Sequence, residues 1–549
     1  MLAFWKPSAE KNIHAASPTS FMELNTLMSG NGGMGSSEPI GFVCGTKGDS
    51  VAFFLNKGIN LSFGQIVRIG SDERSFYARV VNAESSSTLE KIEQLREAEG
   101  KEAFGPYSAY RSVGAVLFLE RRGSKVRSPT FNPNYRDRVY TTTDEDASIL
   151  KLAGELEVGS LRSGEQLLGS VGINIEAIPL MMGMFGMTGS GKTNTELILN
   201  AQAIDSSPKT VALIFDFAGQ LLDGKGIKPQ KGLKDHPLFH SKVQFYSARD
   251  GKMTVGLHTI TPEKLITLFP DIALPQFRLA RKLHRKLGKP WIEQAREAYA
   301  AEGHAGVGRL ADYKMKHVVE ALMLKLSSLS HDLFPSSDYS FVDSVVQNLC
   351  KGITCLMDIS GISSEEQNRI TCLAASAVAR HYKRKWEEDY EEWQKLPTLL
   401  ITLEEAHEFL DPSKPRTIFS DIALTYRKYR VGLNAVTPRP SRINFDVFAE
   451  LWTKVIMKTE LRKDRAYLTE NTPYLEYSDT EIKMLDVGEA LLISEPKIRF
   501  AVPVKVTHYP EYLAGKGKVD YNLPPSKALD VMDEGLKRLR NAGKNFDVR

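Results

Sequence analysis

The sequence PLMMGMFGMTGSGKTNTELILNAQ, residues 179–202, decides the fold of this chain. It begins with an apolar run, Pro179 to Phe185, and ends with the apolar spacing of a helix. Between them lies GMTGSGKT, residues 186–193, so the order is strand, glycine loop, helix, as a P-loop requires. The glycines let successive backbone N–H groups point at a triphosphate, and the helix adds its positive N-terminal end. The sequence therefore predicts that the chain binds a nucleoside triphosphate.

The glycine loop also supplies the side chains expected at the phosphates. Lys192 is expected to reach the β- and γ-phosphates, and the Thr193 hydroxyl is expected to bind Mg²⁺. The alternative, a glycine-rich turn with an incidental lysine, is disfavoured because a strand precedes the loop and a helix follows it. The expected phosphate-binding residues are Gly186, Thr188, Gly189, Ser190, Gly191, Lys192 and Thr193.

A second element, LPTLLITLEEAHEFL at residues 396–410, has the pattern of an acidic strand end. The run Leu399–Leu403 is apolar apart from one threonine, and two glutamates follow it. We expect this strand next to the P-loop strand, with Glu404 on the Mg²⁺ hydration shell and Glu405 on the attacking water. An acidic helix N-terminus, favourable to the helix dipole, is the alternative for this pair. For His407, a polar cap and a role near the phosphates are equally expected.

Further polar residues follow predicted strands or precede them. Asp216 in LIFDFAGQ is expected close to the metal or to the P-loop, and Asp358 in LMDISG ends another strand on the same edge. Arg427 and Arg430 precede a strand, and Arg439 follows it. An arginine placed against a neighbouring subunit's γ-phosphate stabilises transition-state charge. Arg427 is the first candidate for that role and Arg439 the second, with a surface ion pair as the alternative for each.

Length and composition set broad bounds. A chain of 549 residues is expected to form two to four domains, and 42% hydrophobic with 25% charged residues is ordinary for a globular protein. The net charge of +4 argues neither for nor against nucleic acid. The four cysteines lack zinc-site spacing and are expected to be reduced. No apolar run approaches the roughly 20 residues that span a bilayer, and no signal-peptide core is visible, so we expect a cytoplasmic protein.

The first 170 residues predict a leader and a small β domain. Residues 1–38 are expected to be a flexible leader with at most a short turn at 21–28. Residues 39–170 are expected to form a β-barrel-like assembly domain and its connector, with a charged helical insert at 88–100 and a helix at 144–156. No pattern in this barrel suggests chemistry. Its strands are expected in the pieces IGFVCG, SVAFFLNKG, FGQIVRIG, YARVVNAES and VGAVLFLERRG.

Residues 171–510 predict an α/β domain with a RecA-like P-loop ATPase core. Apolar runs that alternate with helical patterns indicate a parallel sheet with crossover helices. A helical insertion at about 261–340 is strongly basic on one predicted helix, which indicates either a DNA-facing surface or a solvated helix face. The tail 511–549 includes a possible brace helix at 528–540. After the P-loop, strands are expected at 210–215, 353–359, 398–403, 431–436 and 489–494.

In their order and spacing, these pieces resemble the HerA branch of the HerA–FtsK family of P-loop ATPases. The resemblance covers residues 39–510. The phrases that carry it are FGMTGSGKTNTE, LIFDFAGQLL, LMDISGISSEEQNRI, LLITLEEAHEFL, YRKYRVGLNAVTPRPSRI and MLDVGEALLIS.

The resemblance implies a homohexameric ring that uses ATP and Mg²⁺ to translocate double-stranded DNA. It also implies a partner nuclease or other effector, in DNA end processing or antiviral defence. It places nucleotide contacts on residues 189–194, and so adds Asn194 to the expected phosphate-binding residues. It also places the acids for Mg²⁺ and for water on Glu404 and Glu405, and a trans-acting arginine near Arg427. Two departures stand out: Pro438 replaces a glutamine common in the family, and Gln220 replaces a common acid.

Three functions are compatible with these features. The leading hypothesis is a ring-forming motor on double-stranded DNA, since no pattern for nuclease, protease or methyl-transfer chemistry accompanies the P-loop. The second is an oligomeric platform, switched by nucleotide, that regulates an effector enzyme with little translocation. The Pro438 departure and the small net charge are both compatible with it. The third, a secretion ATPase of the conjugative type, is disfavoured because no membrane anchor is visible.

Overall fold

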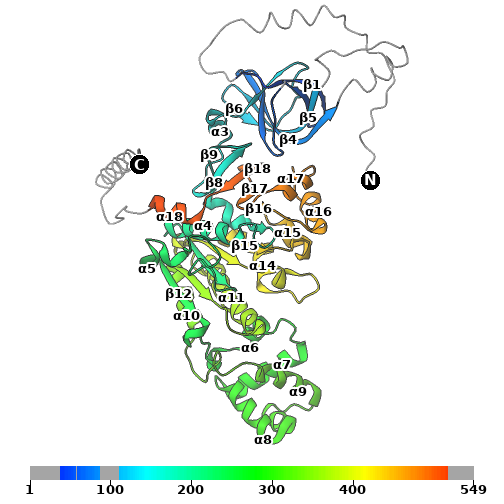
Figure 1. Ribbon diagram of the computed structural model, residues 1–549. Coiled ribbons are helices and arrows are strands. Elements are labelled where there is room, and N and C mark those ends of the chain that lie inside the picture. The colour runs from blue at the N-terminus through cyan, green and yellow to red at the C-terminus, as the bar shows by residue number, and fades with distance from the viewer. Residues whose placement is uncertain (1–37, 57, 87–109, 517–549) are drawn as a thin grey trace, which may run out of the picture.

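The computed structural model describes residues 38–56, 58–86 and 110–516. Figure 1 shows three parts in a row: a β-barrel at one end, a large sheet with its helices in the middle, and a group of helices at the other end. The predictions for the leader before residue 38, the turn at 21–28, the charged insert at 88–100 and the brace helix at 528–540 lie outside the described residues.

The first part is a closed barrel of six strands, which confirms the predicted small β-barrel. Its strand order is β2-β1-β7-β3-β4-β5, and a further pairing of β2 with β5 closes the ring. Alternate side chains point inward, and Val43, Phe53, Ile69 and Val80 are fully buried in its core. A short strand, β6, extends the sheet beyond β5. The strands are β1 (Gly41–Lys47), β2 (Ser50–Leu55), β3 (Ile66–Gly70), β4 (Arg74–Ser86), β5 (Tyr110–Arg122), β6 (Lys125–Arg127) and β7 (Arg138–Thr141).

The second part is an eleven-stranded sheet in the order β12-β13-β11-β14-β15-β10-β16-β17-β18-β8-β9. The first seven strands are parallel and the last four are antiparallel. The bounds are β8 (Leu156–Ser163), β9 (Gln166–Ile173), β10 (Met182–Phe185), β11 (Thr210–Asp216), β12 (Val243–Ser247), β13 (Thr354–Asp358), β14 (Thr398–Leu403), β15 (Val431–Thr437), β16 (Thr453–Met457), β17 (Glu489–Ser494) and β18 (Ile498–Val506).

All five strands predicted after the P-loop are present. The sequence analysis missed β12, β16 and β18, because β12 is only half-buried, β16 contains Lys454 and β18 contains Pro503, which is unusual inside a sheet. The hairpin of β8 and β9 belongs to this sheet, since β8 pairs with β18. The boundary expected at residue 171 therefore falls inside β9.

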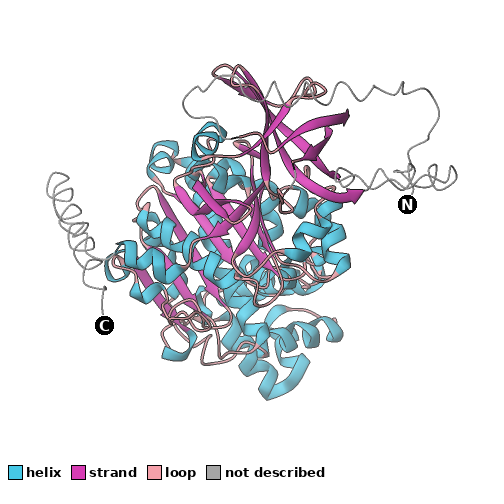
Figure 2. Ribbon diagram, turned by 45° about the horizontal axis from the view of Figure 1, so that its top comes forward, coloured by secondary structure: helices cyan, strands magenta, loops and turns pink. Residues whose placement is uncertain are grey.

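Helices cover both faces of this sheet (Figure 2). The helix after the P-loop, α4 (Lys192–Asp205), belongs to the apolar core of one face, and α10 (Phe341–Cys350), α11 (Ser364–Glu388) and α14 (Ile418–Thr425) belong to the core of the other. The remaining helices of the first two parts are α3 (Asp144–Leu150), α5 (Phe239–Lys242), α12 (Tyr390–Lys395), α13 (His407–Leu410), α15 (Phe445–Ala449), α16 (Arg462–Glu470), α17 (Asp479–Met484) and α18 (Tyr509–Lys516). Helix α3 ends earlier than predicted because Lys151 adopts the left-handed conformation, with φ of 51°.

The third part is the predicted helical insertion. It consists of α6 (Pro262–Leu268), α7 (Leu274–Leu287), α8 (Trp291–Ala311) and α9 (Lys316–Ser327), which pack around the buried Trp291. The basic side chains foreseen here lie on α7 and the turn after it, and most are exposed. They are Arg278, Arg281, Lys282, Arg285, Lys286 and Lys289. In the described part of the chain, no helix combines the length and apolarity needed to cross a bilayer.

Buried polar contacts attach the barrel to the second part. Arg79 on β4 forms an ion pair with Glu481 on α17, and both side chains are at most 5% exposed. The same guanidinium donates to Ser478 Oγ at 2.8 Å. Phe118 of the barrel stacks on Phe500 of β18, with ring centroids 3.9 Å apart. These contacts hold the barrel in one place on the ATPase sheet.

Candidate nucleotide-binding and catalytic site

The P-loop leaves the carboxyl end of β10 and closes where α4 begins. All four residues of β10 are buried, and the loop that follows can be built only from glycine at two positions. Gly189 and Gly191 have φ of 84° and 109°, in the left-handed region. A Cβ at Gly186 would lie 2.6 Å from Ser190 Oγ, which leaves no room for a side chain. Gly191 caps α4 without a side-chain hydrogen bond, so the first N–H groups of this helix are available to an anion.

Lys192 lies folded over the loop. Its Nζ donates hydrogen bonds to the carbonyl oxygens of Gly186 at 2.8 Å and Met187 at 3.0 Å. Burial lowers its pKa, and the nearby carboxylates of Glu196, Glu405 and Glu404 oppose that shift. The ammonium therefore lies at the loop that would surround a phosphate, as the sequence predicts.

The other predicted loop residues divide by position. Thr188 and Gly189 are exposed at the tip of the loop, and Thr193 is partly exposed at the start of α4. The Ser190 side chain is only 1% exposed and its hydroxyl contacts Met457 Sδ at 3.9 Å, so it supports the loop from below.

The side chain of Asn194 serves the fold, so the predicted nucleotide contact of Asn194 remains a prediction for its backbone. Its Nδ2 donates to the Thr507 carbonyl oxygen at 2.9 Å, and its Oδ1 accepts from the Tyr509 N–H at 2.8 Å. Both polar ends of the side chain are thus used to fasten the segment between β18 and α18. Only the backbone N–H of Asn194 remains for a nucleotide. The reason is tertiary: a segment more than 300 residues away in sequence packs beside α4.

The sequence predicted that the acidic strand lies next to the P-loop strand, and this prediction is wrong. β15 lies between β14 and β10, with Thr402 of β14 opposite Asn434 of β15 and Asn434 opposite Met182 of β10. Crossover connections allow a later strand to enter between two earlier ones, and the sequence pattern does not report this order. Glu404 and Glu405 still follow the carboxyl end of β14, on the same edge of the sheet as the P-loop.

Glu404 lies at the base of a group of carboxylates. It accepts a hydrogen bond from the Phe217 N–H at 2.9 Å. Burial, followed by the negative charge of Asp216, raises its pKa to about 7. Asp216 itself accepts from the N–H groups of Gln220 and Leu221, at 3.0 and 2.8 Å, so it shapes its own turn. Asp358, its register partner, accepts from the Ser360 N–H at 3.0 Å.

A functional residue that the sequence analysis missed is Glu196. It lies on α4, four residues after Lys192 and therefore one turn further along the same face, which is a signal the sequence contains. The side chain is 1% exposed and hydrogen-bonds to Glu404. Burial and the charge of Glu404 raise the pKa of Glu196 well above its usual value. Its Oε1 has no hydrogen-bond partner among the described residues.

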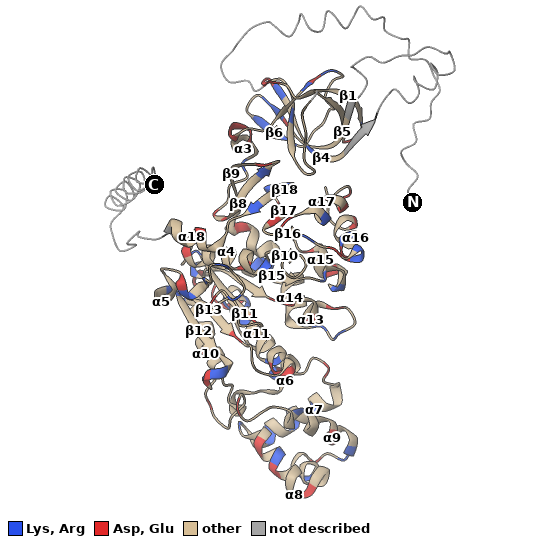
Figure 3. Ribbon diagram, viewed as in Figure 1, with Lys and Arg blue, Asp and Glu red and all other residues tan. Residues whose placement is uncertain are grey.

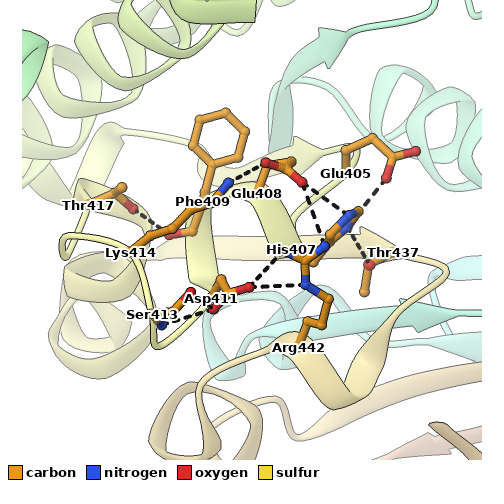
Figure 4. A network of polar contacts seen from close by, with 10 residues as sticks. All are labelled: Glu405, His407, Glu408, Phe409, Asp411, Ser413, Lys414, Thr417, Thr437 and Arg442. Carbon is orange, nitrogen blue, oxygen red and sulfur yellow. Dashed lines mark hydrogen bonds and ion pairs between the residues drawn. The ribbon is translucent and has the colours of Figure 1, made fainter.

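Glu405 adopts an unusual backbone conformation beside an ordered histidine (Figure 4). Its φ is 49°, in the left-handed region that costs free energy for a residue other than glycine, and its side chain is 52% exposed. His407 Nδ1 lies 3.3 Å from Glu405 Oε2 and 3.0 Å from Thr437 Oγ1. Thr437 Oγ1 also accepts from the Arg439 N–H at 3.0 Å. His407 therefore connects Glu405 to the turn after β15.

The arginine candidates lie on opposite edges of the sheet. Arg427 precedes β15 and Arg439 follows it, and β15 runs parallel to β10. Seven residues of strand span about 23 Å, so Arg427 is remote from its own P-loop while Arg439 shares its edge. Arg427 is exposed and lies over the Trp452 ring, 4.9 Å from its centroid. Arg430 donates to the Gln394 carbonyl and stacks on Trp393 at 4.3 Å, so it is a structural residue.

The residues present fit Mg²⁺ and a triphosphate. Among the described residues, no three His, Cys, Asp or Glu side chains are grouped so that they could hold a metal ion. Mg²⁺ in such sites is usually bound by one or two protein groups together with the substrate's phosphates. The Thr193 hydroxyl and the Glu404 carboxylate would be those protein groups, and Glu196 beside Glu404 has a buried oxygen without a hydrogen-bond partner among the described residues.

Comparison with known proteins finds similarity to HerA helicases. Residues 156–377, from β8 into α11, match the family profile "Helicase HerA, central domain". The chain is 24% identical over 464 residues to the DNA double-strand break repair helicase HerA of Sulfurisphaera tokodaii, covering 79% of this chain and 84% of that protein. It is 20% identical over 561 residues to the protein of the same name from Pyrococcus furiosus, covering 91% and 97%. Among solved structures, VirB4 of Thermoanaerobacter pseudethanolicus is 14% identical, covers 65% of this chain and 98% of its own, and has a TM-score of 0.44.

Proposed function

We propose that this chain, which belongs to the HerA family of P-loop ATPases, acts as an ATP-driven motor that moves double-stranded DNA through a ring of its own copies. The observation that carries the proposal is the position of Arg427, at the sheet edge opposite to its own P-loop. A site completed by Arg427 needs a second copy of the chain. The DNA substrate is inferred from the relatives, which are named DNA double-strand break repair helicases.

Each residue of the site has a task in ATP hydrolysis. The N–H groups at the start of α4 and the ammonium of Lys192 bind the phosphates. Glu405 orients the attacking water and accepts its proton, because its carboxylate is exposed at the same edge. Glu404 and Thr193 would hold Mg²⁺, which neutralises phosphate charge when bound. Glu196 lies beside Glu404, where burial and the charge of Glu404 raise the pKa of Glu196.

The arginines divide their work between subunits. Arg427 contributes its guanidinium to the γ-phosphate bound by a neighbouring copy, where it stabilises transition-state charge. Trp452 packs against the Arg427 guanidinium through a cation–π contact, which leaves the positive charge of Arg427 without a carboxylate partner in this contact. Arg439 acts within its own subunit, because its backbone belongs to the turn that contacts Thr437 and His407.

Several finer features belong to the same proposal and derive from the family resemblance. They are a hexameric ring and a partner nuclease or other effector in DNA end processing or antiviral defence. A location in the cytoplasm is also part of the proposal, on the grounds given by the sequence. Pro438 favours a second function, an oligomeric platform that regulates an effector with little translocation. Proline offers neither a side-chain donor nor a backbone N–H at the turn where the family often has glutamine.

The test is steady-state ATP hydrolysis with and without long linear duplex DNA, at low and moderate salt. We expect duplex DNA to raise turnover severalfold and salt to remove the increase, because contacts to phosphates depend steeply on ionic strength. Lys192→Ala and Glu405→Gln are expected to abolish turnover, whereas Glu391→Gln, an exposed carboxylate on α12, serves as the matched control and stays active. Wild-type turnover that ignores DNA at every salt concentration would rule out the motor and favour the platform.

A further inference from the structure

The end of the barrel carries a basic surface that the ATPase site does not use. We define the β6 lobe as residues 120–138, which include the end of β5, the strand β6 and the segment that leads into β7. The lobe contains six basic and two acidic residues, so its net charge of +4 equals that of the whole chain. Figure 3 shows Lys and Arg gathered around β6.

Three cations face one another across the strands at this end. Arg74 of β4 lies opposite Arg122 of β5, and Arg122 lies opposite Lys125 of β6. Residues directly opposite in antiparallel strands point to the same face, so the three side chains form one row. Like charges in that arrangement repel each other and destabilise the pairing. Binding of an anion to the row therefore reduces the repulsion between its cations.

The carboxylates of the lobe are already committed. Glu120 is fully buried and holds Arg74 Nε at 3.0 Å and Arg127 Nη2 at 3.6 Å. Asp137 accepts from the Asn134 N–H at 2.7 Å. In the described part of the chain, Arg122 and Lys125 have no carboxylate partner within 4.0 Å. Both side chains are exposed to solvent.

The adjacent turn between β3 and β4 does not neutralise the row. Asp72 of this turn pairs with Arg68 at 2.8 Å. Glu73 contacts the lobe through its backbone, since its carbonyl oxygen accepts from the Gly123 N–H at 3.1 Å. Two cations of the row thus remain available to an outside anion.

Two aromatic rings are exposed in the same lobe. Phe131 is 58% exposed and lies 4.8 Å from the Arg74 guanidinium, which fixes it beside the basic row. Tyr135 is 67% exposed and lies near Arg136, at 5.6 Å. Exposed rings among basic residues are the arrangement on which unpaired bases stack.

We infer that the β6 lobe binds single-stranded DNA, such as an overhang on the duplex that the motor engages. The cations match the phosphates of a strand, and the rings match the flat faces of its bases, which a duplex keeps stacked inside. An acidic protein surface would satisfy the cations but would leave the rings without a base to stack on. This inference rests on the proposed function for its choice of DNA.

The experiment measures the binding of the full chain to a fluorescent oligothymidylate and to a blunt duplex of equal length, by anisotropy over a range of salt. We expect tighter binding of the oligothymidylate. Arg122→Ala combined with Lys125→Ala should weaken it about tenfold and reduce the slope of log affinity against log salt by about 1.4, or about 0.7 for each phosphate that the protein no longer neutralises. Tyr135→Ala should weaken it about tenfold with the slope unchanged, because stacking involves no counterion.

The matched control is Lys209→Ala combined with Lys351→Ala, which removes two exposed charges from the ATPase domain and should change neither affinity nor slope. Wild-type affinity in the Arg122/Lys125 double variant would overturn the inference and leave an acidic protein as the occupant of the lobe. Equal losses for oligothymidylate and duplex would overturn it as well, since they indicate a general phosphate contact. Turnover with blunt duplex, measured on the same variants, should be unchanged. A wild type that binds the oligothymidylate but shows no stimulation by duplex would refute the motor and not the lobe.

Discussion

At the scale of single residues, the site depends on where protons are held. Beneath the P-loop, burial raises the pKa of both Glu196 and Glu404, and these two carboxyls oppose the lowering of the Lys192 pKa by burial. His407 is largely buried, and burial lowers its pKa, so it meets Glu405 and Thr437 as a neutral ring. The charge on Glu404 is therefore the feature most sensitive to pH near neutrality.

The affinity for Mg²⁺ and nucleotide should rise with pH through about 7, the pKa of Glu404. Below that pKa the carboxyl holds a proton and is neutral, whereas above it the carboxylate is available to the metal, so binding strengthens by up to about tenfold per pH unit. Calorimetry of Mg²⁺–nucleotide binding between pH 6 and 8 measures this, together with the protons released. Glu404→Gln should bind weakly at every pH. A flat wild-type profile would contradict the assignment of Glu404.

At the scale of elements, α4 serves two purposes that sequence spacing does not separate. Its first turn presents N–H groups to the phosphates, while Asn194 ties the helix to the segment after β18. Thr193 and Asn194 are neighbours in sequence, yet the Asn194 side chain is used by the tertiary fold while Thr193 is the proposed Mg²⁺ ligand.

Substitutions at these two adjacent residues should therefore affect different properties: stability for Asn194 and ligand binding for Thr193. Asn194→Ala removes two hydrogen bonds and should lower the free energy of unfolding by about 1–3 kcal/mol, with nucleotide affinity close to that of the wild type. Thr193→Ala should weaken the binding of Mg²⁺ and nucleotide with little change in stability. Urea denaturation and nucleotide titration on both variants measure this. If Asn194→Ala abolished nucleotide binding without lowering stability, its side chain would be a nucleotide contact after all.

At the scale of the whole molecule, one sheet presents different chemistry at its two edges. The P-loop, Glu405 and Arg439 share the carboxyl edge, and Arg427 lies at the other. The buried pair of Arg79 and Glu481 fixes the barrel to this body, so the β6 lobe and the ATPase site keep a defined relation.

Mixing inactive subunits should restore ATP turnover if Arg427 acts across an interface. Arg427→Ala and Glu405→Gln are each expected to reduce turnover about 10³-fold or more. In an equal mixture, about a quarter of sites combine an intact Glu405 with a neighbour's intact Arg427, and turnover should recover to a corresponding fraction. Arg439→Ala is the matched control: mixed with Glu405→Gln, it should restore nothing, because Arg439 acts within its own subunit. Failure of the first mixture would place Arg427 outside the site.

The sequence alone determined the local features, because they depend on short-range patterns. The glycine loop, the apolar parallel strands, the acid pair after β14 and the helical insertion all follow from residue spacing, and the family resemblance came from their order. The pairing of β8 with β18, the insertion of β15 between β14 and β10, and the use of Asn194 by a distant segment depend on contacts between residues far apart in sequence. Only the tertiary structure could decide those. It alone placed Glu196 against Glu404, and it alone showed that β15 runs parallel to β10, so that Arg439 and not Arg427 shares the edge of the P-loop, because these relations depend on strand order and direction and not on spacing along the chain.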